Sequence, residues 1–154
     1  MGDLVADQVR GDEWGGTRVE LDLDDAQVAA DSQLLECVVV NLLANAAAYN
    51  RDGGEVRVAV GADPDDPATA LLAVANLARP ADVAAVQAAL SSEIETFRGS
   101  ARGHGIGLTV VALIVDALRG TVRTTGPAGC VRIEVRLPMS LRSEPEATSP
   151  LAGG

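Results

Sequence analysis

The order in which strand-like and helix-like segments follow one another constrains the fold of this chain more than any other feature of its sequence. Alternating apolar and polar residues predict half-buried strands, and apolar residues spaced three or four apart predict amphipathic helices. In chain order the predicted segments are a helix (4–9), a strand (18–24), a helix (31 or 32 to 49), two strands (56–60 and 69–75), a weaker helix (80–95), a helix ending near 118, and two closing strands (121–125 and 131–137). Strand pairs that are adjacent in the sequence are expected to form hairpins. The sequence therefore predicts an α/β fold, a two-layer sandwich in which helices cover one face of a mixed sheet.

Local composition adds three details to this prediction. Residues 63–67 are charged and contain proline, which predicts a loop. Residues 69–75 are almost continuously apolar, which is typical of a strand buried on both faces. Gly120 is expected to stop the helix that precedes it. The 154 residues suit one domain, which we expect to span residues 1–138 and to be followed by a disordered Ser-, Pro- and Glu-rich tail over residues 139–154.

Composition excludes several classes of function. The chain has 12 Lys plus Arg against 22 Asp plus Glu, a formal charge of −10, which argues against nucleic-acid binding through phosphate contacts. Only 2% of residues are aromatic, so the core must be aliphatic and stacking platforms for bases are excluded. The apolar stretches are shorter than the roughly 20 residues that cross a bilayer, so we expect a cytoplasmic location without direct membrane insertion. Cys37 and Cys130 have no zinc-like spacing, which indicates reduced, buried thiols.

The first candidate site is a pair of asparagines in the helix that ends at Tyr49. Asn41, Asn45 and Tyr49 are four residues apart, so they share one helix face. A buried amide without a partner costs about 1–3 kcal/mol, so two amides on an otherwise aliphatic helix need a reason. Either both bond to loop backbone, or they form a polar wall whose oxygens are available to a hard cation such as magnesium.

The second candidate site is the glycine-rich segment Gly103-His104-Gly105-Ile106-Gly107, which precedes a helix. Glycines there free backbone N–H groups to face an anion, and the helix N-terminus adds partial positive charge. The alternative interpretation is a flexible surface loop. His104, the single histidine, fits a solvated residue or a phosphate contact better than a general base.

Together and in this order, the two segments resemble the ATP-binding catalytic domain of sensor histidine kinases, within the superfamily that includes DNA gyrase, Hsp90 and MutL. The resemblance runs from about residue 19 to 138. Residues 31–46 are similar to the asparagine box, residues 103–108 to the second glycine box, and residues 129–138 to the closing strand with its Leu-Pro. The resemblance implies the Bergerat-type ATP-binding fold, with ATP and Mg²⁺ as ligands.

The resemblance also implies roles for individual residues. Asn45 would coordinate the magnesium, and Asn41 would support it one turn earlier, which makes these two the catalytic candidates. The implied nucleotide-binding set is Asn45, Tyr49, Asn76, Arg98, Arg102, Gly103, His104, Gly105, Gly107 and Leu108. Within this set the glycines would wrap the phosphates, and Arg98 and Arg102 would pair with them from a short lid; the alternative for each arginine is a solvated charge.

The chain departs from the family pattern at several positions. Asn76 stands where the first glycine box has the Asp that accepts from the adenine amine, and Ala78 and Pro80 stand where that box has glycines. Ala48 replaces a basic residue of the asparagine box, and Cys37 stands four residues before Asn41, where the family often has an acidic residue or Gln.

The sequence holds no acceptor histidine apart from His104, which lies in the glycine segment, so the acceptor is expected outside this chain. The implied function is transfer of the ATP γ-phosphoryl group to a histidine of a dimerisation domain, in cis or in trans, with a response regulator downstream. Two alternatives remain at this point: an anti-sigma-factor type serine kinase, and a degenerate pseudokinase that acts as an interaction module.

Overall fold

The computed structural model describes residues 1–11, 16–79, 83–84, 86 and 106–140. Their elements, in chain order, are α1 (Gly2–Gly11), β1 (Arg18–Leu23), α2 (Ser32–Tyr49), β2 (Glu55–Asp63), β3 (Asp66–Leu77), α4 (Ile106–Ala117), β4 (Thr121–Thr125) and β5 (Cys130–Pro138). The predicted strands and the helices before and after them are therefore present. The weaker helix expected over 80–95, and the tail from residue 141 on, lie outside the described residues.

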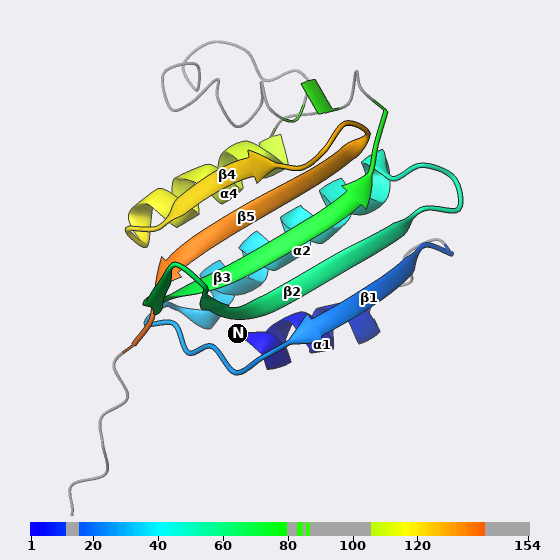
Figure 1. Cartoon of the computed structure of the whole chain (residues 1–154). Helices are drawn as coiled ribbons and strands as arrows, with labels where there is room; N and C mark the ends of the chain where they lie inside the picture. The colour runs from blue at the N-terminus through cyan, green and yellow to red at the C-terminus, as the bar shows by residue number, and fades with distance from the viewer. Residues whose placement is uncertain (12–15, 80–82, 85, 87–105, 141–154) are drawn as a thin grey trace, which may run out of the picture.

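The strands form one mixed sheet in the order β1-β2-β3-β5-β4. β1 and β2 are parallel, and a parallel pair needs a crossover connection, which α2 supplies. The pairs β2–β3 and β4–β5 are antiparallel hairpins, as predicted. Figure 1 shows α1, α2 and α4 on the same side of the sheet. The predicted two-layer sandwich with helices on one face is confirmed.

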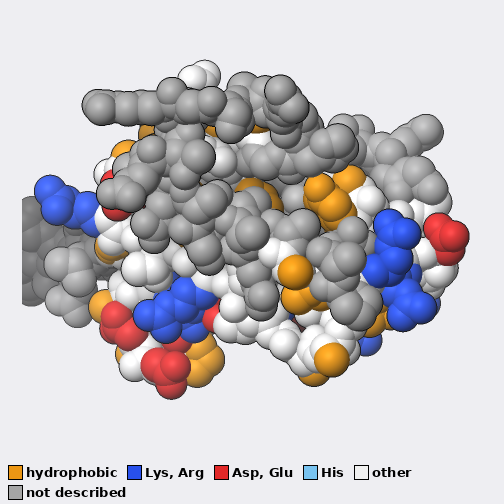
Figure 2. Space-filling model, turned by 90° about the horizontal axis from the view of Figure 1, so that it is seen from above, with side chains coloured by type: hydrophobic (Ala, Val, Ile, Leu, Met, Phe, Trp, Pro, Cys, Tyr) orange, Lys and Arg blue, Asp and Glu red, His pale blue; other side chains and the backbone are white. Residues whose placement is uncertain are grey.

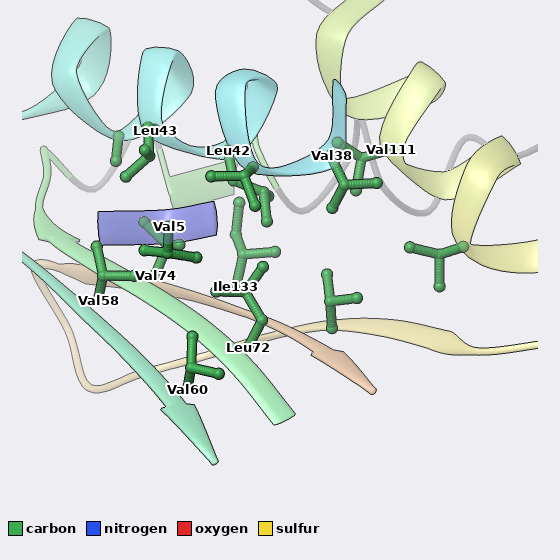
Figure 3. Close-up of a cluster of buried hydrophobic side chains, with 14 of the residues drawn as sticks. Val5, Val38, Leu42, Leu43, Val58, Val60, Leu72, Val74, Val111 and Ile133 are labelled. Atoms are coloured by element: carbon green, nitrogen blue, oxygen red, sulfur yellow. The ribbon is translucent and has the colours of Figure 1, made fainter. Parts of the chain in front are cut away.

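The core lies between the sheet and the helices and is aliphatic, as the low aromatic content requires. Alternate residues of the central strands point toward the helices, among them Val58 in β2 and Leu72 in β3, each 1% exposed. They meet Leu42 and Val38 from α2 and Val111 from α4 (Figure 3). Each such side chain contributes about 1.5–3 kcal/mol by burial, so this interface holds the two layers together.

The prediction that residues 69–75 are buried on both faces was wrong. Leu71 and Ala75, which point away from the helices, are half-buried. Ala73 on that same face is buried, and it lies between Ala59 of β2 and Glu134 of β5 in the strand register. The small size of Ala73 and its place between two neighbouring strands are consistent with its burial without a second layer of helices.

The loop predicted over residues 63–67 is instead a tight turn at residues 64 and 65, and both strands run up to it. The Asp63 side chain accepts a hydrogen bond from the Asp65 N–H (2.9 Å), and the Asp66 side chain accepts one from the Ala68 N–H (3.1 Å). Carboxylates that bond the backbone two residues on are a common way to close a turn. These two hydrogen bonds close the turn, so β2 and β3 extend up to residues 64 and 65 as one hairpin.

Charged side chains pair across the open face of the sheet. Arg136 donates to Asp63 and to Glu134 (2.9 Å), and Glu134 also pairs with Arg132 (2.8 Å). The hydrogen bond from the Asp65 N–H, followed by that from Arg136, lowers the pKa of the Asp63 carboxyl below its ordinary value. Asp63 is only 4% exposed, so its carboxylate is held inside a hydrogen-bonded network rather than in water.

The end of α4 differs from the prediction in one residue. Arg119, not Gly120, takes the left-handed conformation, with φ of 57°. The Gly120 N–H donates to the Val115 carbonyl (2.8 Å) and the Arg119 N–H to the Asp116 carbonyl (2.9 Å), which is the Schellman pattern. Gly120 has a separate reason to be glycine, because a Cβ there would clash with the backbone carbonyl oxygen of Arg136.

Three further predictions can be compared with the structure. Cys37 and Cys130 are free, as predicted, but both are half-buried rather than buried. Met139 and Ser140 form backbone hydrogen bonds with Ala68 and Gln27, so the ordered body extends past residue 138. Within the described ranges no helix has the length and apolar character needed to span a membrane.

Candidate functional site

The site is built around α2, whose boundaries follow from its sequence. Asp31 caps the helix, because its Oδ1 accepts from the Gln33 N–H at 2.7 Å, and Asn50 ends it in an extended conformation. Leu42 and Leu43 of this helix are buried against the sheet. Asn41 is half-buried on the flank of that apolar face, where α4 packs against α2.

The Asn41 carboxamide is held by the preceding turn of its own helix. Its Nδ2 donates to the Cys37 carbonyl oxygen at 2.8 Å and lies 3.4 Å from the Cys37 Sγ. Its Oδ1 lies beside Gly107, where an added Cβ would come within 2.7 Å of that oxygen. The structure thus brings the asparagine segment and the end of the glycine segment into direct contact.

Gly107 and Leu108 both belong to the first turn of α4. Leu108 is 3% exposed and anchors this turn in the core. The first backbone N–H groups of a helix have no partner inside it and carry partial positive charge, which suits an anion. The predicted anion-binding terminus therefore begins next to Asn41.

Asn45 and Tyr49 occupy the next two turns of α2, and both are half-buried. Asn45 forms no side-chain hydrogen bond with any described residue, in contrast to Asn41. Among the described residues no three His, Cys, Asp or Glu side chains are grouped as a metal site would require. The Asn45 carboxamide is one group that could hold a cation such as magnesium, because amide oxygen is a hard donor.

Asn76 lies in β3, next to its last residue, and is 4% exposed. Its Nδ2 donates to the Leu77 carbonyl oxygen at 3.2 Å. The Arg51 N–H donates to the same carbonyl at 2.9 Å, so the turn after Tyr49 is fastened to the end of β3. Asn76 and the C-terminal end of α2 therefore lie at the same end of the molecule, toward the upper right of Figure 1.

Ala78, two residues after Asn76, is completely buried, and its N–H donates to the Gly129 carbonyl (3.0 Å). The fold thus accommodates a methyl group where the family pattern has glycine. Seen from above, basic side chains lie at the right-hand end of the molecule and also at its left and lower left, with acidic side chains near them (Figure 2). Arg98, Arg102, Gly103, His104 and Gly105 lie outside the described residues, so their expected roles stay predictions.

Comparison with known proteins decides the family. The model of the family described as histidine kinase-, DNA gyrase B-, and HSP90-like ATPase matches residues 30–141. The chain belongs to this family. The match includes α2, the end of β3 and α4, so the elements that form the candidate site are those that the family model covers.

Solved structures of this ATPase family agree with that assignment. The mycobacterial sensor histidine kinase MprB is 26% identical, with a TM-score of 0.66 over 89% of this chain and 92% of that one. The catalytic domain of histidine kinase ThkA has a TM-score of 0.66 at 18% identity, over 88% of this chain and 92% of that one. Full-length ShkA, solved in complex with AMPPNP, is 19% identical with a TM-score of 0.64, over 90% of this chain but 29% of that one. The domain therefore has the fold of histidine kinase ATP-binding domains, as the sequence predicted.

Sequence analysis missed the contacts that organise the site. Cys37 was interpreted as a reduced, buried thiol and as a departure from the family pattern, and its contact with Asn41 was not predicted. Its position four residues before Asn41 was a usable signal, because side chains four apart in a helix are neighbours. Nothing in the sequence pointed to the Arg51–Leu77 hydrogen bond, which joins backbone groups of segments far apart in the chain.

Proposed function

We propose that this chain is the catalytic domain of a two-component sensor histidine kinase, which transfers the γ-phosphoryl group of ATP to a histidine outside the chain. The observation that carries the proposal is the contact between Asn41 and Gly107, which unites the asparagine segment with the N-terminus of α4. Family membership supports nucleotide binding in general. The likeness to MprB supports the narrower class of sensor kinases.

In this proposal the residues of the chain bind and orient the nucleotide. The N–H groups in the first turn of α4 face the phosphates, and Asn76 faces the base. Asn45 holds the magnesium, which when bound neutralises charge on the triphosphate. Phosphoryl transfer needs little covalent chemistry from the protein, so positioning and electrostatic stabilisation suffice.

The test combines nucleotide binding with phosphotransfer. Calorimetric titration with ADP is expected to show binding that requires Mg²⁺ and is lost when EDTA is present. Because the sequence supplies no acceptor histidine outside the glycine segment, incubation with γ-labelled ATP is expected to leave the chain unlabelled. Stoichiometric, acid-labile labelling of the chain alone would contradict the proposal that the acceptor histidine lies outside this chain. Absence of all nucleotide binding would favour the pseudokinase alternative.

The role of Asn45 is tested by substitution. Asn45→Ala is expected to abolish Mg-dependent ADP binding while leaving circular dichroism unchanged, because the side chain is half-buried and has no described hydrogen bond to lose. Asn45→Asp keeps an oxygen ligand and is expected to retain Mg dependence. Gln33→Ala, which removes an exposed amide from the other end of α2, is the matched control and should bind like the wild type. Unaltered affinity in Asn45→Ala would show that this residue is structural.

A further inference from the structure

The two asparagines of α2 have different surroundings. Asn45 has no side-chain hydrogen bond among the described residues, whereas Asn41 is bound through Nδ2 and packed through Oδ1. We propose that Asn41 is a positioning residue: Cys37 fixes its carboxamide, and the carboxamide sets the place of the first turn of α4. In this assignment Asn41 contacts neither nucleotide nor metal. The expected effect of Asn41 substitutions on nucleotide affinity rests on the proposed function, but their expected effect on the first turn of α4 does not.

The orientation of the Asn41 amide follows from its partner. A carbonyl oxygen is only an acceptor, so the Asn41 atom 2.8 Å from the Cys37 oxygen must be the nitrogen. The Cys37 thiol, 3.4 Å from the same nitrogen, closes the other side. With Nδ2 turned toward Cys37, the Oδ1 atom is necessarily directed away from it, and there it meets Gly107 of α4.

A side chain at Gly107 would meet the Asn41 carboxamide before any other group. A Cβ at this position would lie 2.7 Å from the Asn41 Oδ1, and real Cβ atoms essentially never approach a heavy atom within 3.0 Å. The next two atoms that it would meet, at 3.6 and 3.8 Å, also belong to Asn41. A methyl group at residue 107 would therefore displace either the Asn41 carboxamide from its hydrogen bond with Cys37 or the first turn of α4 from its place. Leu108, buried directly beyond it, packs this turn against the core.

This arrangement links Asn41 to nucleotide binding indirectly. The first-turn N–H groups of α4 face an anion only if the turn is correctly placed, and their effect falls off within about one turn. A shift of that turn therefore weakens phosphate binding although no ligand contact of Asn41 is lost.

A double-mutant cycle tests the contact. Gly107→Ala alone is expected to lower the Tm and to weaken Mg-ADP binding about tenfold, because the new methyl group pushes α4 away from Asn41. In the Asn41→Ala background the same methyl group has space and can fill the place of the lost carboxamide, so adding Gly107→Ala should lower the Tm no further and should recover most of the affinity that Asn41→Ala loses. If Asn41→Ala abolishes binding as completely as Asn45→Ala and Gly107→Ala restores nothing, Asn41 contacts the ligand and the proposal is wrong.

Two further measurements separate positioning from ligation. Asn41→Asp loses the donor to the Cys37 carbonyl but offers a better magnesium ligand, so positioning predicts weaker Mg-ADP binding and ligation predicts retained or tighter binding. Cys37→Ala keeps the backbone carbonyl and is expected to change affinity by less than about twofold. Hydrogen exchange at the amides of residues 110–113, which donate to the carbonyls of the first turn of α4, should be faster in Asn41→Ala than in the wild type when measured without nucleotide. Unchanged exchange there would overturn the proposal. Absence of ADP binding in the wild-type chain would refute the proposed function instead, and the exchange measurement would still test the role of Asn41.

Discussion

Asn76 allows the clearest test of how this domain differs from its family, because one substitution restores the family residue at a position whose contacts the structure defines. Asn76 is 4% exposed, and its Nδ2 donates to the Leu77 carbonyl at 3.2 Å. Asn76→Asp replaces that donor with a carboxylate oxygen facing a carbonyl oxygen. The lost hydrogen bond and the buried, unsatisfied oxygen together cost about 1–3 kcal/mol. For a chain of this size we expect the Tm of the ligand-free protein to fall by about 3–9 °C.

The destabilisation by Asn76→Asp should depend on pH in a defined direction. Burial raises the pKa of the introduced carboxyl above the roughly 3.9 of an unfolded Asp. The folded state therefore binds its proton more tightly than the unfolded state does. The Tm deficit relative to wild type should grow as pH rises from about 4 and should level off above the folded-state pKa.

Nucleotide binding should change in the opposite direction. A charged acceptor for the adenine amine is worth about 1 kcal/mol more than a neutral one, so Asn76→Asp should tighten ADP binding about five- to tenfold, with a smaller gain for GDP. Thermal unfolding at pH 5–8 and calorimetry with both nucleotides measure the two effects. Asn76→Ala serves as the control, since it removes the hydrogen bond without adding a charge and should give a pH-independent Tm loss. An Asn76→Asp protein with wild-type Tm at pH 8, or with weaker ADP binding, would refute this reasoning.

Three other predictions concern stability. Arg119→Gly should stabilise the fold by about 0.5–1 kcal/mol in urea titrations, because removal of a left-handed non-glycine residue outweighs the added chain entropy; a loss of stability would mean that the Arg119 side chain has a role of its own. The lowered pKa of Asp63 means that its contribution is present above the unfolded pKa and is lost as pH falls through the folded one. Acid unfolding of Asp63→Asn should therefore have a shallower pH dependence below about pH 4, and an unchanged curve would show that other carboxylates control it. Leu42→Ala, at a side chain that is 0% exposed, should cost about 2–5 kcal/mol of unfolding free energy, and a cost under about 1 kcal/mol would contradict its place in the core.

The parts of the fold that could be predicted from sequence are those fixed by local signals. α2 has a capping Asp31, an aliphatic run and a non-helical Asn50 after it, and the structure gives the predicted boundaries. The hairpin turn after β2 was missed because Asp and Pro are typical both of long loops and of tight turns. A tight turn forms here because the Asp63 and Asp66 side chains accept hydrogen bonds from the nearby backbone. The pattern of apolar and polar residues does not reveal such bonds.

The candidate site could be located from sequence but its internal organisation could not. Spacing of four residues placed Asn41 and Asn45 on one helix face, and that inference holds. Spacing does not tell which way an amide points, because that depends on what packs against it. The Cys37 carbonyl fixes the nitrogen of the Asn41 amide, and the oxygen then faces Gly107, which is far from Asn41 in the sequence. The same glycine was assigned to phosphate contact from the sequence pattern, and the structure gives it a packing reason first.

The charge of the chain illustrates why composition excluded nucleic acid without excluding a nucleotide. Four of the described arginines form ion pairs with carboxylates on the open face of the sheet. The N–O distances are 3.1 Å for Arg18–Glu55, 3.0 Å for Arg57–Glu20, 2.8 Å for Arg132–Glu134 and 2.9 Å for Arg136–Glu134. Cations neutralised in this way add little attraction for a polyanion beyond a Debye length of about 8 Å. On the helix side, the donors that the described residues offer to phosphate include the first N–H groups of α4, which act only at contact distance. A net charge of −10 is therefore compatible with binding one short polyphosphate, because the sign of the total charge governs long-range attraction while local donors govern the site.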